Sequence, residues 1–201
     1  MHIKPQHLEA ALAKANELND HYGLHHLTGA DPQKYVDYFL SSCGAFGIGP
    51  VRIVEIDIAF EDSAVYSVCV MNKDGATDIA LAKGLNHCWK RYTICKELVH
   101  VLIDREEYRN LNLSQHTEEV AVAFSLDDSR PGLAVTAELL SEISSMEFLF
   151  PYAHREKILR LQQTPNFLAI AQQYRIPQLL VDRYLGARHM ESLKGHSRRL
   201  A

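Results

Sequence analysis

Hydrophobic residues recur at intervals of three and four over residues 5–20, where Leu8, Leu12, Ala15 and Leu18 would share one face of a helix. Apolar periodicity, together with proline at helix starts and ends, predicts further helices in the rest of the chain. These cover residues 31–42, 93–103, 114–126, 134–150, 154–163, 165–175 and 177–187. The second half of the chain is therefore expected to be almost entirely helical.

Three short runs between the second and third of these helices have the composition of β-strands. They cover residues 51–58, 64–71 and 77–82, and the second is rich in valine. The sequence Asn-Lys-Asp-Gly at residues 72–75 favours a hairpin turn between the second and third runs. We expect a small antiparallel sheet and an α+β fold.

Length and composition indicate an ordinary globular chain. With 201 residues, 47% hydrophobic and 23% charged, one domain over residues 1–187 is expected, followed by a polar, basic tail over 188–201. The net charge of −4 argues against a nucleic-acid partner, and no apolar run is long enough for a membrane helix. Four cysteines without a C-x-x-C pair, and no signal-like start, predict reduced thiols in a cytoplasmic protein.

The predicted helix over 93–103 carries the chemistry. Lys96 and His100 are four residues apart and share one face, with Glu97 beside them. Preceded by Arg-Tyr-Thr at 91–93, this segment resembles the ImmA/IrrE family of zincin-like metallopeptidases, in which the helix bears H-E-x-x-H. There two histidines bind Zn²⁺ and the glutamate activates water. The resemblance implies a zincin-like fold with Glu97 in the catalytic position and His100 as a metal ligand.

Lys96 stands where the first histidine of that motif is expected. A protonated ammonium has no lone pair to offer a metal, so only a neutral, desolvated Lys96 could act as a ligand. The less costly arrangement is a protonated Lys96 in the place of the metal, paired with the same carboxylates. His87 or His116 could replace the missing ligand instead, although neither has a ligand spacing to His100.

Two later segments extend the resemblance. Glu-Phe-Leu-Phe-Pro at 147–151 is similar to the end of the family helix that supplies the third metal ligand from an upstream glutamate. Glu142 and Glu138 are both candidates, and Glu142 is preferred. Residues 168–187 resemble the helix-turn-helix-like tail common in the family.

These features lead to competing hypotheses about function. The first is a degenerate family member without metal, which binds a protein partner such as a repressor, toxin or antitoxin in a stress, phage or mobile-element setting. The second is a working zinc peptidase that cleaves a transcriptional repressor, with Glu97 as general base. Metal-free acid–base chemistry by Lys96 and Glu97, and a nucleic-acid regulator built on residues 168–185, are further alternatives. Whether the chain is an enzyme stays open at this point, because the motif is incomplete.

Overall fold

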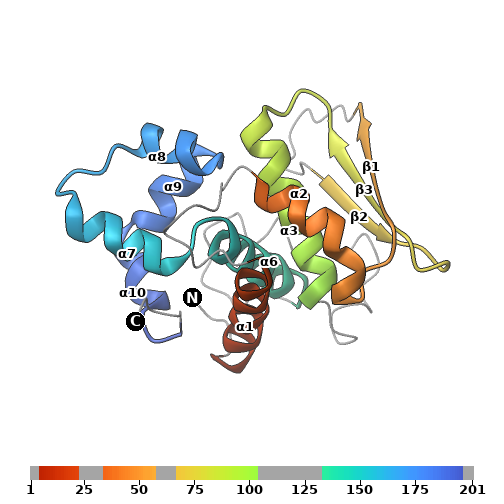
Figure 1. Cartoon of the computed structure of the whole chain (residues 1–201), viewed down its shortest axis with the longest axis horizontal. Coiled ribbons are helices and arrows are strands. Elements are labelled where there is room, and N and C mark those ends of the chain that lie inside the picture. The colour runs from red at the N-terminus through yellow and green to blue at the C-terminus, as the bar shows by residue number, and fades with distance from the viewer. Residues whose placement is uncertain (1–4, 23–33, 58–66, 104–132, 197–201) are drawn as a thin grey trace.

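The computed structural model describes residues 5–22, 34–57, 67–103 and 133–196. The N-terminal half contains α1 (Pro5–Tyr22), α2 (Tyr35–Ser42), the 3-10 helix η2 (Cys43–Phe46), β1 (Val51–Ile56), β2 (Ser67–Met71), β3 (Thr77–Ala82) and α3 (His87–Ile103). The C-terminal half contains α6 (Leu133–Leu149), α7 (Tyr152–Leu161), α8 (Phe167–Tyr174), α9 (Gln178–Leu185) and α10 (Ala187–Leu193). The predicted α+β class is confirmed, with helix dominating (Figure 1).

The sheet is mixed, so the prediction of an antiparallel sheet is wrong for one strand. The strand order is β1-β3-β2; β2 runs antiparallel to β3, whereas β1 runs parallel to it. The predicted turn joins β2 to β3, with Gly75 at a φ of 82°. β1 and β2 lie on opposite edges of β3, and the twenty residues between the end of β1 and the start of β3 are enough for a connection to a parallel strand.

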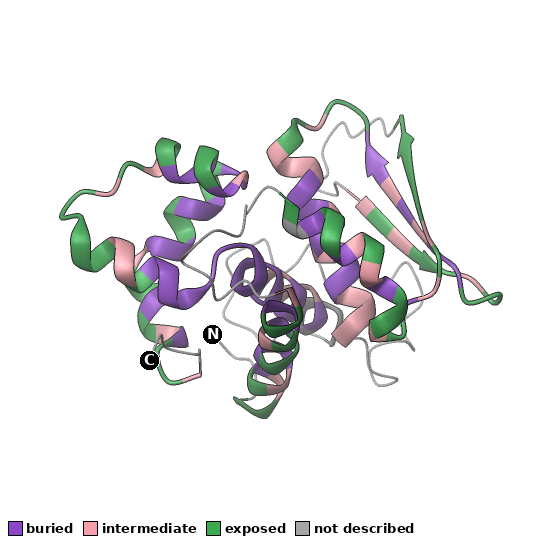
Figure 2. Ribbon diagram, viewed as in Figure 1, coloured by how far each residue is buried: buried purple, intermediate pink, exposed green. Residues whose placement is uncertain are grey.

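One face of the sheet packs on α3 and forms part of the main core (Figure 2). Ile79 and Leu81 on β3 are fully buried, and they belong to the same cluster as Cys95 and Leu98 of α3. Side chains alternate across a strand, so these two residues point to one side while Asp78 points to the other. The sheet therefore supports the helix that carries the candidate site.

Helix α3 begins six residues earlier than the sequence predicts, at His87 rather than at residue 93. The Trp89 amide donates to Asn86 Oδ1 at 3.0 Å, which is an N-cap contact. Arg91 lies inside the helix and is buried. Its Nη1 donates to the backbone oxygens of Tyr174 (3.1 Å) and Arg175 (2.8 Å), so α3 is tied to the end of α8.

The C-terminal helices follow the predicted order with small shifts at their ends. Pro151 and Pro177 directly precede α7 and α9, and Asn166 caps α8 through its side chain. The segment predicted as a polar tail from residue 188 forms most of α10, whose Met190 and Leu193 are buried in one apolar cluster with residues of α1, α6 and α7. The predicted helix over 114–126, the start of the helix at 31–33 and the last basic residues, 198–199, lie outside the described residues.

Candidate functional site

The candidate site lies where α3 packs against α6 (Figure 1). Glu138 of α6 contacts two side chains of α3 at once. The Lys96 ammonium donates to Glu138 Oε2 at 2.6 Å, and His100 Nε2 lies 2.9 Å from Oε1 of the same carboxylate. Lys96 and His100 therefore share the face expected from their spacing, and that face points toward α6.

A second carboxylate adjoins this group. Glu97 is only 5% exposed, and its Oε1 accepts a hydrogen bond from the Ser67 hydroxyl of β2 at 2.5 Å. The same oxygen lies 3.6 Å from Lys96 Nζ. Lys96 thus stands between two carboxylates, one from its own helix and one from α6. We call Ser67, Lys96, Glu97, His100 and Glu138 the Lys96 cluster.

The charges around Lys96 keep it protonated. Burial alone would lower the pKa of the lysine, because desolvation disfavours the ammonium. The negative charges of Glu97 and Glu138 outweigh that effect and raise the pKa above the ordinary lysine value. A lysine held in this state donates hydrogen bonds and has no lone pair for a metal.

The structure places Glu138, and not the preferred Glu142, beside His100. Glu142 lies one turn further along α6, where its carboxylate accepts from Arg183 Nη1 at 3.0 Å and from the Tyr184 hydroxyl at 3.1 Å. Both partners belong to α9. The two glutamates share a helix face, but they pair with different neighbours.

One of the two replacement ligands considered for zinc, His87, lies far from His100. His87 and His100 are thirteen positions apart on α3, which corresponds to about 20 Å along the helix axis. His87 lies instead 3.5 Å from Arg175 Nη1. His116 lies outside the described residues. Within the described ranges, no group of three or more His, Cys, Asp or Glu side chains is arranged to hold a metal ion.

One cysteine of α3 serves packing rather than chemistry. Cys95 is fully buried in the main core, where burial raises the pKa of its thiol to about 12. Such a thiol is not ionised near neutral pH and is a poor nucleophile.

Sequence reasoning missed Ser67. Its place on the α3-facing side of β2, between apolar neighbours, is the signal that could have identified it.

We expect Lys96→Met to lower the free energy of unfolding by roughly 1–3 kcal/mol, because it leaves the buried Glu97 carboxylate beside Glu138 with no cation between them. Urea denaturation followed by circular dichroism would measure the change. Lys83→Met is the control, since Lys83 pairs with an exposed Asp57 and should change the same quantity by less than about 0.5 kcal/mol. Equal effects of the two substitutions would contradict a special role for Lys96.

No protein-family model and no curated protein matches the chain. Among the described helices, none combines the length and apolar character needed to cross a bilayer.

Proposed function

We propose that this chain is a zincin-like protein of the ImmA/IrrE type in which an ion-paired lysine replaces the catalytic metal, and that it acts by binding a protein partner. The observation that carries the proposal is the 2.6 Å contact between Lys96 and Glu138, beside His100 and Glu97. In the family that the sequence resembles, a metal would be held by the residues at positions 96 and 100 and by a glutamate from the later helix. Here the positive charge at that place is the Lys96 ammonium, which is covalently part of the chain.

The chemistry of the Lys96 cluster favours binding over hydrolysis. Within the part of the chain that the structure describes, the Lys96 cluster offers a metal two ligands of the family pattern, His100 and Glu138, whereas a catalytic zinc normally has three protein ligands. Glu97 Oε1 accepts from the Ser67 hydroxyl and lies 3.6 Å from Lys96 Nζ, so one of the two oxygens of this carboxylate is already held by a neighbour. A partner such as a repressor, toxin or antitoxin, in a stress, phage or mobile-element setting, fits a protein that retains the framework without the metal.

Elemental analysis of the purified protein tests the proposal. We expect the natural chain to carry no stoichiometric zinc, and Lys96→His to carry about one zinc per chain, bound by the introduced imidazole together with His100 and Glu138. Adding Glu138→Gln to that variant should reduce its zinc content, because a carboxylate ligand is lost. Lys83→His is the matched control, since it adds a histidine at an exposed site.

Two results would contradict parts of this proposal. About one zinc per natural chain, removed by a chelator together with peptidase activity, would contradict the proposal and support the working zinc peptidase. Failure of Lys96→His to bind zinc, in a variant that remains folded, would contradict the zincin-like framework itself.

A further inference from the structure

A hollow of about 330 Å³ lies between the first turn of α3 and the turn that joins α8 to α9. Its walls are mainly apolar and include Trp89, Ile176, Pro177 and Leu179. Trp89 extends from α3, and the other three residues come from the α8–α9 turn and the start of α9. The Lys96 cluster lies further along α3 and uses none of these residues.

Two leucines at this hollow are exposed far beyond what packing requires. Leu168 is 54% exposed and Leu179 is 59% exposed, although both line the same hollow. A hollow bordered by large exposed apolar side chains is typical of a surface that binds another protein. Leu161, at 67% exposed, is an apolar surface residue that does not line it.

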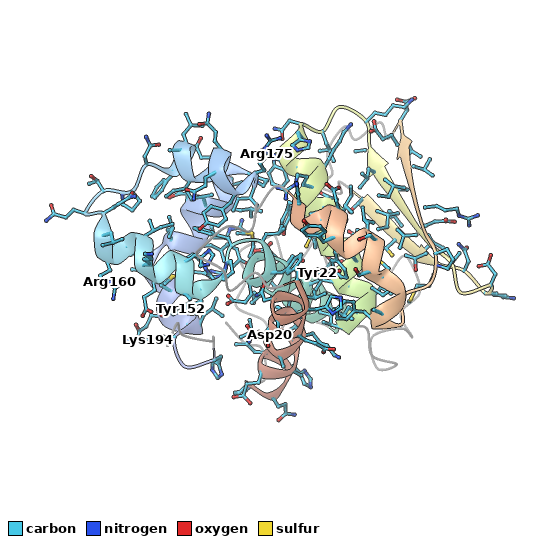
Figure 3. All side chains as sticks on the ribbon, viewed as in Figure 1. Asp20, Tyr22, Tyr152, Arg160, Arg175 and Lys194 are labelled. Carbon is cyan, nitrogen blue, oxygen red and sulfur yellow. The ribbon has the colours of Figure 1, made fainter. Side chains whose placement is uncertain are left out.

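The electrostatic surroundings of the hollow favour negative charge. The N-terminal ends of α3 and α9 both border the hollow, and neither helix has an acidic residue in its first turn. In α3 the Trp89 amide already donates to Asn86, so the amides at the start of α9 are the freer ones. The free amide groups of a helix N-terminus attract anions. Arg175 lies beside the hollow, next to the first turn of α3 (Figure 3), and has no carboxylate partner among the described residues. The exposed His87 lies beside it.

We propose that this hollow binds an acidic segment of a partner protein. A large apolar side chain of the segment enters between Trp89 and Leu179, and flanking carboxylates lie against Arg175 and the first turn of α9. The small size and apolar lining of the hollow suit one inserted side chain, in the manner of peptide recognition by an apolar anchor. They do not suit the row of phosphate contacts that nucleic acid requires. This inference names a docking site for the partner in the proposed function and rests on that function.

The single tryptophan of the chain makes the test direct, because Trp89 is in the wall of the hollow. The probe is a pool of ten-residue peptides with Asp and Glu in the flanks and Leu, Ile, Met or Phe at the centre. A matched pool carries Lys and Arg in the flanks, and neither pool contains Trp or Tyr. Emission from Trp89 in the full chain is recorded as each pool is added.

We expect the acidic pool alone to shift the Trp89 emission to shorter wavelength, with saturation at roughly 10–100 μM. Leu179→Asp and Arg175→Asn should each weaken the response at least about tenfold, since one adds charge to the hollow and the other removes its cation. Asparagine tolerates the left-handed backbone that Arg175 adopts, at a φ of 50°. Leu168→Asp is a second test of the rim should either variant misfold, and Leu161→Asp is the matched control, expected to leave binding within about twofold.

The inference is overturned if the acidic pool gives no shift, if the basic pool gives an equal one, or if Leu161→Asp weakens binding as much as Leu179→Asp. A shift produced by duplex DNA, in competition with the acidic pool, would identify a nucleic-acid site and overturn it as well. The zinc measurements on Lys96→His involve none of these residues. Failure here and failure of the proposed metal replacement are therefore distinguishable.

Discussion

Replacing Arg155 with methionine is expected to lower the free energy of unfolding by about 3–5 kcal/mol, the cost of breaking a buried ion pair by removing one partner. Arg155 is fully buried and pairs with the carboxylate of Glu147, which is itself only 1% exposed. The guanidinium also lies over the rings of Tyr152 and Tyr184, with centroid distances of 5.6 and 5.4 Å. Methionine fills much of the same volume, so the loss of unfolding free energy reports the buried Glu147 charge that remains without its partner.

Glu147 needs a substitution that keeps its second contact. Its Oε1 accepts from the Tyr152 amide at 3.0 Å, at the start of α7, and glutamine can keep that hydrogen bond while removing the charge. Burial raises the pKa of Glu147 above its usual value despite the opposing charge of Arg155. The pair as a whole therefore adds little stability, since its desolvation is costly.

A double-mutant cycle checks this expectation in urea. Glu147→Gln and Arg155→Met should each destabilise strongly, whereas the double variant should lose clearly less than the sum of the two. Lys14→Met is the control at an exposed pair with Glu17, where a change of less than about 0.5 kcal/mol is expected. Additive losses would show that the two side chains contribute independently and would contradict the interpretation.

This buried pair illustrates what local sequence patterns miss. The helix α7 reads YAHREKILRL, in which Arg155 is one of several charged residues of an ordinary surface helix. Nothing in that pattern marks it as the one that is fully buried. Its burial follows from the packing of α7 against α9 and α10, which depends on contacts distant in sequence.

The elements themselves were largely predictable because they depend on local signals. The periodic stripe of α1 and the hairpin turn before β3 are encoded within a few residues, and β3 occupies the predicted residues, 77–82. The parallel pairing of β1 depends on which edge of β3 it reaches, and no local signal specifies that edge. Periodicity therefore predicted the strands but not their arrangement.

The same distinction applies to the Lys96 cluster. Helical spacing placed Lys96 and His100 on one face, and it placed Glu138 and Glu142 on one face of another helix. The choice between the two glutamates depends on how α3 and α6 lie along each other, which spacing within one helix cannot determine. Glu138 meets α3, whereas Glu142 meets α9.

Acidification is expected to destabilise the protein through two histidines that the fold keeps neutral. Burial, with the nearby charges of Lys157 and Arg155, lowers the pKa of His154 to about 4. Burial, with Arg155 and Arg183, lowers the pKa of His189 to about 4 as well. Unfolding returns each ring to the ordinary value near 6.5, so below that pH the unfolded chain binds more protons than the folded chain.

The stabilising effect of the neutral rings is thus fully present above about pH 6.5 and is lost as the pH falls toward 4. A shift of this size is equivalent to about 3 kcal/mol for His154, which is 5% exposed. His189 is more accessible, and its contribution is expected to be smaller because solvent screens it.

His154→Gln separates this effect from the titration of carboxylates over the same range. Glutamine cannot take up a proton, and its amide can keep a hydrogen bond to the Tyr174 hydroxyl, which lies 3.0 Å from His154 Nδ1. We expect the variant to lose about 3 kcal/mol less stability than the natural chain between pH 6.5 and 4, measured by urea denaturation at each pH. His87→Gln, at an exposed position, is the control and should leave the acid dependence as it is in the natural chain. An unchanged acid dependence in His154→Gln would mean that the His154 ring does not resist protonation in the fold, and the loss of stability in acid would then belong to the carboxylates.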